Sequence, residues 1–210
     1  MNLIAHGRFV TFEGGEGAGK STQAKLLAER LRAAGQNPIL TREPGGSPGA
    51  EQIRKLLVEG EPDRWPPLAE TLLFLAARAD HVARVIEPAL TTGNWVICDR
   101  FIDSTVVYQG TARGVGAARV RALQAAAGAL EPDLTFILDV EPDAGLKRTT
   151  GRSKSEDRFE QFDREFHRQL RAAFLEIARN EPKRCAVVDG SRSVESVAAE
   201  IWRIVTERLA

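Results

Sequence analysis

The residues most able to do chemistry lie in a glycine-rich stretch near the N-terminus, residues 13–23, which reads EGGEGAGKSTQ. Gly14, Gly19, Lys20 and Ser21 match the spacing G-x-x-x-x-G-K-[ST] of a phosphate-binding loop. The glycines let backbone N–H groups converge on phosphate oxygens, the lysine adds a positive charge, and the serine hydroxyl can ligate Mg²⁺. A strand-like run before the stretch and helical spacing after it supply the context that a chance match lacks. The residues expected to bind the triphosphate of ATP are Gly14, Gly15, Glu16, Gly17, Ala18, Gly19, Lys20, Ser21 and Thr22.

An acidic and a basic residue follow a second apolar run. Residues 95–98 read WVIC, and Asp99 and Arg100 come directly after them. An aspartate at the end of such a strand is typical of the carboxylate that helps to hold Mg²⁺ in triphosphate-binding enzymes. We therefore predict Mg²⁺ as the cofactor, with Ser21 and Asp99 at the metal and Arg100 reaching an anion. The plainer alternatives are a carboxylate that caps the next helix and an arginine in solvent.

A third group of residues could recognise an acceptor molecule. Arg42 lies in a second Gly-rich stretch, 41–46, and its guanidinium suits a phosphate, although an ordinary turn explains the stretch equally well. Phe74 and Arg78 share one face of a predicted helix, where they could stack on a base and donate to its carbonyl. A core phenylalanine and a surface arginine are the alternative. Three further residues at helical spacing can line one groove: Thr105, Tyr108 and Gln109.

Basic residues gather around a polar break at 151–156. They are Arg148, Arg152, Lys154 and Arg158. A charge run is usually a solvated surface. Here the glycine and serines of the break favour a mobile segment, and we expect a short basic lid over 148–158 that brings cations to phosphates.

Strand and helix patterns alternate along the whole chain and must position these residues. Apolar strand-like runs occupy 9–13, 37–42, 95–98, 134–140 and 185–188. Helical spacing occupies 20–34, 50–58, 68–90, 104–109, 117–129, 157–180 and 194–209. This alternation predicts an α/β fold, with a five-stranded parallel sheet flanked by helices in three layers, and ligands at the carboxyl ends of the strands. We expect a single domain over 1–210.

Composition excludes several classes of protein. Lys+Arg and Asp+Glu both number 29 among 210 residues, so the net charge of zero argues against a protein that coats nucleic acid. Neither an apolar signal sequence nor a run long enough to cross a membrane is visible, which favours the cytoplasm. Cys98 and Cys185 lie at strand-like runs and are expected to be buried thiols. The three histidines, His6, His81 and His167, lack metal-ligand spacing and are expected to be solvated.

Five of these motifs together resemble the thymidylate kinase (dTMP kinase) family of nucleoside monophosphate kinases. The matching segments, in the order and at the spacing of the family, are 12–23, 41–46, 73–78, 99–101 and 108–110. The resemblance implies a P-loop kinase that phosphorylates dTMP to dTDP with ATP and Mg²⁺. It also implies a homodimer.

The resemblance implies a role for each matched residue. Phe74 would stack on thymine and Arg78 would donate to its O4. The remaining implied contacts are Thr105 and Gln109 near the N3 edge of the base, Tyr108 against C2′ of the sugar, Arg42 and Arg100 on the acceptor phosphate, and Glu13 near the sugar or the phosphate-bound metal.

The family also implies where the catalytic charges come from. Some members carry an arginine inside the phosphate loop, at the position that is Gly17 here. The cation should then come from the lid, and Arg152 is the expected residue, with its basic neighbours as alternatives. Lys20, Asp99 and Arg100 complete the expected catalytic set.

Two other functions fit parts of the sequence. A kinase for a nucleoside or another nucleotide would share the phosphate loop, but a nucleoside has no phosphate for Arg42 and Arg100 to bind. A P-loop switch that hydrolyses nucleotide would position a water molecule and would lack a base-binding aromatic pocket.

Overall fold

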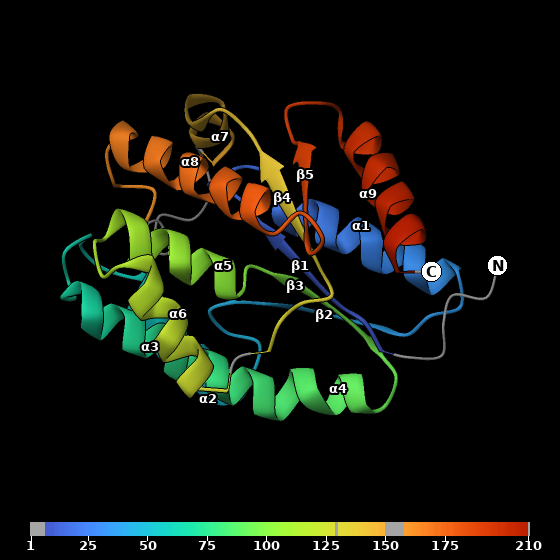
Figure 1. The fold of residues 1–210 in the computed structure, drawn as a ribbon, viewed down its shortest axis with the longest axis horizontal. Helices are drawn as coiled ribbons and strands as arrows, with labels where there is room; N and C mark the ends of the chain where they lie inside the picture. The colour runs from blue at the N-terminus through green and yellow to red at the C-terminus, as the bar shows by residue number, and fades with distance from the viewer. Residues whose placement is uncertain (1–6, 129, 150–157, 210) are drawn as a thin grey trace.

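The computed structural model describes residues 7–128, 130–149 and 158–209. Five parallel strands form one sheet in the order β2-β3-β1-β4-β5 (Figure 1). Their bounds are β1 Phe9–Glu13, β2 Pro38–Arg42, β3 Trp95–Asp99, β4 Leu134–Asp139 and β5 Cys185–Asp189. The predicted five-stranded parallel sheet is confirmed.

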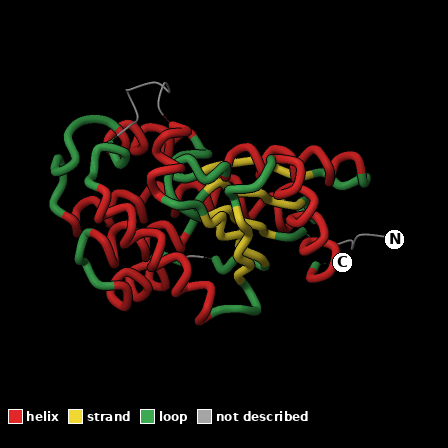
Figure 2. The backbone as a smooth tube through the Cα atoms, turned by 90° about the horizontal axis from the view of Figure 1, so that it is seen from above, coloured by secondary structure: helices red, strands yellow, loops and turns green. Residues whose placement is uncertain are grey.

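Helices cover both faces of the sheet (Figures 1 and 2). In chain order they are α1 Lys20–Ala33, α2 Pro48–Val58, α3 Pro67–His81, η1 Val82–Ile86, α4 Glu87–Thr91, α5 Ile102–Thr105, η2 Val106–Ala112, α6 Ala117–Ala126, α7 Pro142–Thr149, α8 Arg164–Asn180 and α9 Val194–Arg208, where η marks a π-helical turn. α1 and α9 pack on the face that carries Val10 and Phe12. The opposite face, with Phe9 and Ile137, packs against η1, η2 and α8. The alternation of side chains along a strand thus supplies the cores on both faces.

The helix expected over 68–90 is interrupted by a π-helical turn. The backbone N–H of Glu87 reaches back five residues to the carbonyl of Val82. Pro88 follows, and proline has no N–H to donate to the carbonyl four residues earlier. The wider turn accommodates this missing donor without ending the helix, because α4 continues from Glu87.

The helix expected from residue 157 begins later, at Arg164. The side chain of Asp163 accepts a hydrogen bond from the N–H of Phe166 and caps this helix, α8. Residues 158–163 precede the helix and are not helical. The closing helix, α9, is capped in the same way, since the side chain of Ser193 accepts from the N–H of Ser196.

Candidate active site

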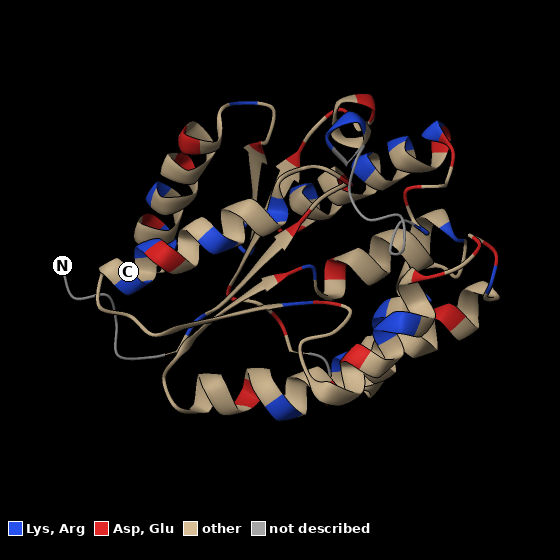
Figure 3. Ribbon diagram, turned by 180° about the vertical axis from the view of Figure 1, so that it is seen from behind, with Lys and Arg blue, Asp and Glu red and all other residues tan. Residues whose placement is uncertain are grey.

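Each strand of the sheet ends in a charged residue. These residues are Glu13, Arg42, Asp99, Asp139 and Asp189. Because parallel strands place their carboxyl ends at one edge, the charges gather there (Figure 3). A cavity opens at this edge beside β2 and β3, and the phosphate loop forms one end of it.

The phosphate loop leads from β1 into α1. Gly14, Gly17 and Gly19 have φ angles of 134°, 65° and 95°, a region that favours glycine. Lys20 is 7% exposed, and its Nζ donates to the carbonyl oxygens of Gly14, at 3.1 Å, and Gly15, at 2.7 Å. Burial and the nearby charge of Arg100 lower the pKa of Lys20 to about 8. The loop is thus closed around its own cation.

A serine hydroxyl and a strand-end carboxylate meet beside the loop. The Oγ of Ser21 donates a hydrogen bond to Oδ2 of Asp99. Hydroxyl and carboxylate oxygens suit Mg²⁺, and in triphosphate-binding enzymes this pair holds the metal. The residues present therefore fit the predicted metal.

Gly17 packs directly against helix α7. A Cβ atom at Gly17 would lie 2.0 Å from the carbonyl oxygen of Gly145, and a Cβ at Gly145 would lie 2.3 Å from the carbonyl oxygen of Glu16. Neither position has room for a side chain. This contact explains why the loop carries no arginine at residue 17.

Arg100 joins the phosphate loop to the rest of the cavity. Its φ angle of 66° places it in the left-handed region, which is strained for a residue with a side chain. Its guanidinium donates to the carbonyl of Gly14 at 3.1 Å, to Ser104 Oγ at 3.2 Å and to Glu16 Oε1 at 2.8 Å. The Tyr108 hydroxyl donates to the same Glu16 oxygen at 2.8 Å.

The sequence predicts Glu16 only as a residue that binds the triphosphate. In the structure its carboxylate also contacts Arg100 and Tyr108. Burial opposes its charge, but Arg100 and Lys20 outweigh burial and lower the pKa of Glu16 to about 2. Glu16 lines the cavity next to Tyr108. Residue spacing could not indicate this contact, because Glu16 and Tyr108 lie 92 positions apart.

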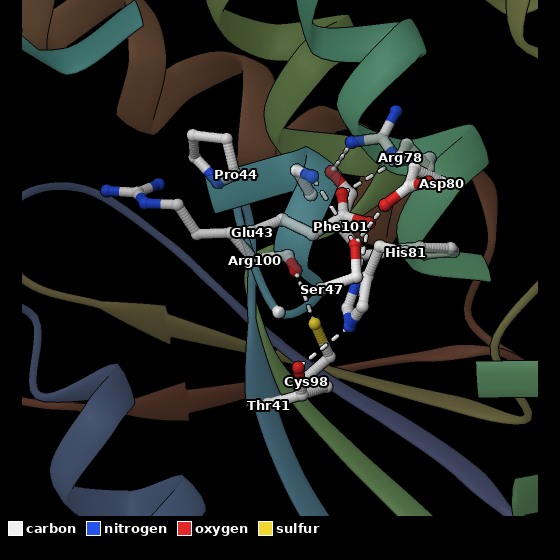
Figure 4. A network of polar contacts seen from close by, with 12 residues as sticks. Thr41, Glu43, Pro44, Ser47, Arg78, Asp80, His81, Cys98, Arg100 and Phe101 are labelled. Carbon is white, nitrogen blue, oxygen red and sulfur yellow. Dashed lines mark hydrogen bonds and ion pairs between the residues drawn. The ribbon is translucent and has the colours of Figure 1, made fainter. Parts of the chain in front are cut away.

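Arg78 is held by a buried network (Figure 4). Its Nε donates to Glu43 Oε2 at 2.8 Å, and Nη2 donates to the Phe101 carbonyl and to Thr105 Oγ1, both at 2.9 Å. Glu43 also contacts Nδ1 of His81 at 3.1 Å. Nη1 of Arg78 is buried without a hydrogen-bond partner among the described residues. The network thus fixes the guanidinium and leaves one donor, and Arg78 lines the cavity.

Aromatic and polar side chains from α3, α5 and η2 also line the cavity. Phe74, Thr105, Tyr108 and Gln109 all line it, as the sequence predicts. Phe159, which the sequence analysis missed, also lines it, with its ring centroid 6.1 Å from that of Phe74 and 5.5 Å from that of Tyr108. The sequence analysis placed Phe159 in the helix expected from residue 157, whereas the residue lies in the turn before α8.

Of two further residues expected to contact the acceptor, Arg42 lies at the cavity and Glu13 does not. Arg42 lines the cavity and forms an ion pair with Glu51 at 3.2 Å. Glu13 lies outside the cavity lining, fully buried, and accepts from the N–H of Phe101 at 2.8 Å and the Oγ of Ser104 at 2.5 Å. Burial and the charge of Asp103 raise the pKa of Glu13 to about 7. Its contact with substrate stays a prediction.

The expected lid is only partly described. Arg152 and Lys154 fall at residues 150–157, outside the described residues. Arg148 donates to the carbonyl of Gly190 at 3.0 Å. Arg158 is not a lid cation: it is fully buried, pairs with Glu70 at 2.5 Å and donates to the carbonyls of 57, 61 and 62. Three carbonyls and a carboxylate satisfy this guanidinium inside the protein.

The expectation for the histidines is wrong for two of them. His81 is 0% and His167 4% exposed. His81 bridges Glu43 and the Thr41 hydroxyl, at 3.1 and 2.7 Å, so hydrogen bonds replace solvent. The expectation for Cys98 and Cys185 is confirmed, since both are free and buried. No helix among residues 7–128, 130–149 and 158–209 is long and apolar enough to span a membrane.

Comparison with known proteins identifies the family of this site. Residues 12–201 match the family model described as thymidylate kinase. The chain belongs to the thymidylate kinase family. A thymidylate kinase of Ruegeria pomeroyi is 55% identical, over 97% of this chain and 96% of that protein. A thymidylate kinase of Dinoroseobacter shibae is 56% identical, over 93% of this chain and 94% of that protein. The crystal structure of thymidylate kinase from Ehrlichia chaffeensis has a TM-score of 0.78 and 35% identity, covering 96% of this chain and 99% of that one. Thymidylate kinase membership agrees with the resemblance of the five motifs.

Proposed function

We propose that this chain transfers the γ-phosphoryl group of ATP to dTMP and forms dTDP. The observation that carries the proposal is that the phosphate loop, Arg100 and the aromatic side chains of Phe74 and Tyr108 line one cavity, and that Arg100 contacts the loop at Gly14. A nucleotide bound by the loop and an acceptor bound by Phe74 and Arg78 would then meet at Arg100. Family membership supports dTMP as that acceptor.

Charge neutralisation and alignment carry the mechanism. The second pKa of a phosphate monoester is ~6, so the acceptor is mostly a dianion at neutral pH and needs no general base. Lys20 and Arg100 offset the negative charge of the phosphates, while Arg42 offers an exposed guanidinium at the acceptor side. Mg²⁺ held by Ser21 and Asp99 would neutralise charge on the transferring phosphoryl group. Arg152 is proposed to supply the further cation that the phosphate loop cannot carry.

An acceptor screen tests the activity. The purified chain is mixed with ATP, Mg²⁺ and one acceptor from a panel of nucleosides and nucleoside monophosphates, and ADP and phosphorylated product are quantified. We expect turnover with dTMP and none with thymidine. Turnover of a nucleoside would support the nucleoside kinase, and rapid ATP hydrolysis without acceptor would support the nucleotide switch.

We also propose that two copies associate and act in the cytoplasm. Leu56 on α2 and Leu72 on α3 are 38% and 50% exposed, and pairing would remove this apolar surface from water. Two free thiols fit a reducing compartment. Light scattering after size exclusion tests the first point: a mass near 46 kDa, twice 23.0 kDa, is expected, and a mass of one chain would contradict it.

A further inference from the structure

Glu70 is a fully buried carboxylate that the proposed mechanism does not use. It lies in the first turn of α3. Nε2 of Gln109 donates to its Oε1 at 2.9 Å. Two guanidinium groups flank the same carboxylate, Arg158 at 2.5 Å from Oε2 and Arg113 at 3.6 Å from Oε1. The carboxylate therefore joins a cavity residue to one fully buried cation, Arg158, and one partly buried cation, Arg113.

Glu70 decides which end of the Gln109 amide faces the cavity. The oxygen and nitrogen of an amide are often interchangeable in a structure, and the hydrogen-bond partners decide between them. An ionised carboxylate only accepts hydrogen bonds. The NH₂ group of Gln109 must then face Glu70, and the Gln109 carbonyl oxygen is the end left for a ligand in the cavity that it lines.

Arg78 presents the opposite polarity in the same cavity. Its guanidinium is fixed by Glu43 and Thr105, and its buried Nη1 keeps a free donor among the described residues. A donor from Arg78 and an acceptor from Gln109 match a carbonyl oxygen next to an N–H group. Thymine and uracil carry this pair at O4 and N3. Cytosine carries the reverse pair, an amino donor and a bare ring nitrogen.

We infer that Glu70 is a positioning residue that makes the base site selective for pyrimidines with an N3–H over cytosine. It acts through Gln109 and does not touch the base. The inference rests on the proposed acceptor pocket and names a determinant of its selectivity. A wrongly turned amide would oppose N–H to N–H, and a site built to pair such a group strongly rejects a mismatch.

The isosteric variant Glu70→Gln tests this role. Arg158 attracts the new carbonyl oxygen, so the new NH₂ turns toward residue 109 and makes the Gln109 amide rotate. We expect kcat/KM for dTMP to fall ~10- to 100-fold, and its ratio over kcat/KM for dCMP to fall at least ~10-fold. An unchanged ratio would overturn the inference.

The double variant Glu70→Gln/Gln109→Glu tests rescue. The new amide can donate to the new carboxylate, whose second oxygen restores an acceptor for the base. We expect the dTMP/dCMP ratio to recover by ~10-fold relative to the single variant. If Glu70 served only as the charge partner of Arg158, the double variant would be no better than the single one.

Arg158→Lys is the matched control for general loosening. This substitution removes the guanidinium group that donates to the carbonyls of residues 57, 61 and 62. It leaves the hydrogen bond between Gln109 and Glu70. We expect a lower melting temperature and an unchanged ratio of kcat/KM for dTMP over kcat/KM for dCMP. A ratio that falls as it does in Glu70→Gln would contradict the positioning role. Calorimetric Kd values for dTMP and dCMP give the same ratio without turnover. If the wild-type protein did not phosphorylate dTMP, the proposed activity would be refuted. The ratio of the Kd values for dTMP and dCMP would still test the role of Glu70.

Discussion

The Ser21 hydroxyl donates a hydrogen bond to the Asp99 carboxylate, although the two residues lie 78 positions apart in the chain. Ser21 lies in the first turn of the helix after β1, and Asp99 ends β3. The parallel pairing that sets Phe12 opposite Asp99 brings them together. The sheet register therefore creates the proposed metal site.

Removal of the Ser21 hydroxyl should weaken the response to Mg²⁺. In Ser21→Ala the carboxylate of Asp99 loses its partner and the metal loses an oxygen, so half-maximal activity should need about 10- to 100-fold more Mg²⁺. A titration of initial rate against Mg²⁺ measures this. Ser196→Ala, at an exposed hydroxyl in the first turn of α9, is the control and should keep the wild-type Mg²⁺ midpoint. Equal midpoints for wild type and Ser21→Ala would remove Ser21 from the metal site.

A side chain at residue 17 should destabilise the fold. Gly17→Ala combines a left-handed φ of 65° with a Cβ that lies 2.0 Å from the Gly145 carbonyl. We expect the free energy of unfolding to fall by about 2–4 kcal/mol, measured by urea denaturation. Gly15→Ala is the matched control, because a Cβ there meets no atom within 4 Å. A Gly17→Ala protein as stable as Gly15→Ala would show that α7 moves freely.

Two arginines of the expected lid, Arg152 and Arg158, should differ in what their loss affects, the first catalysis and the second stability. Arg152→Ala should lower kcat by ~10³-fold or more, with little change in Kd for dTMP, because an arginine in this role stabilises the transition state. Arg158→Met should lower the free energy of unfolding by about 3–5 kcal/mol, because it leaves the Glu70 carboxylate buried without its nearest cation. Steady-state kinetics and denaturation of both variants test the contrast. An Arg152→Ala enzyme with wild-type kcat would move the role to a neighbouring cation.

Glu13 should make stability fall as pH rises. Its folded pKa of about 7 lies above the ordinary value of 4.5, so the folded state binds a proton more tightly than the unfolded state. This contribution is fully present below pH 4.5 and is lost as pH rises through 7, a change on the order of 3 kcal/mol.

The Glu13→Gln variant isolates this contribution. His167, whose pKa is lowered by burial, has the opposite sign in part of the same pH range, so the wild type alone shows only a sum. The difference between wild type and Glu13→Gln, followed by denaturation from pH 4.5 to 8, should change steadily in favour of the variant. A difference that stays constant with pH would place the folded pKa of Glu13 at its ordinary value.

The strands and the phosphate loop could be predicted because the residue patterns that specify them lie within short segments of the chain. Buried runs such as 95–98 and the glycine spacing of the phosphate loop depend on neighbouring residues alone. The sequence analysis missed the π-helical turn before Pro88 and the late start of α8. A proline inside a helix, or a charged segment before a helix, is compatible with more than one backbone conformation.

Pairings between distant residues were beyond the sequence. Arg158 looks like any residue of a basic run, and its burial depends on carbonyls from the connection before α3. Glu16 gains its place beside Tyr108 only when the phosphate loop and η2 meet. His81 appears solvated until Glu43 and Thr41 are seen on either side of it.

The contact between Gly17 and Gly145 also limits which substitutions the phosphate loop can accept. An arginine at residue 17 has no room while α7 keeps its place, and a larger residue at 145 meets the carbonyl of Glu16. A cation could enter the phosphate loop at residue 17 only if α7 were displaced. An undisturbed α7 and a side chain at residue 17 therefore exclude each other in this fold.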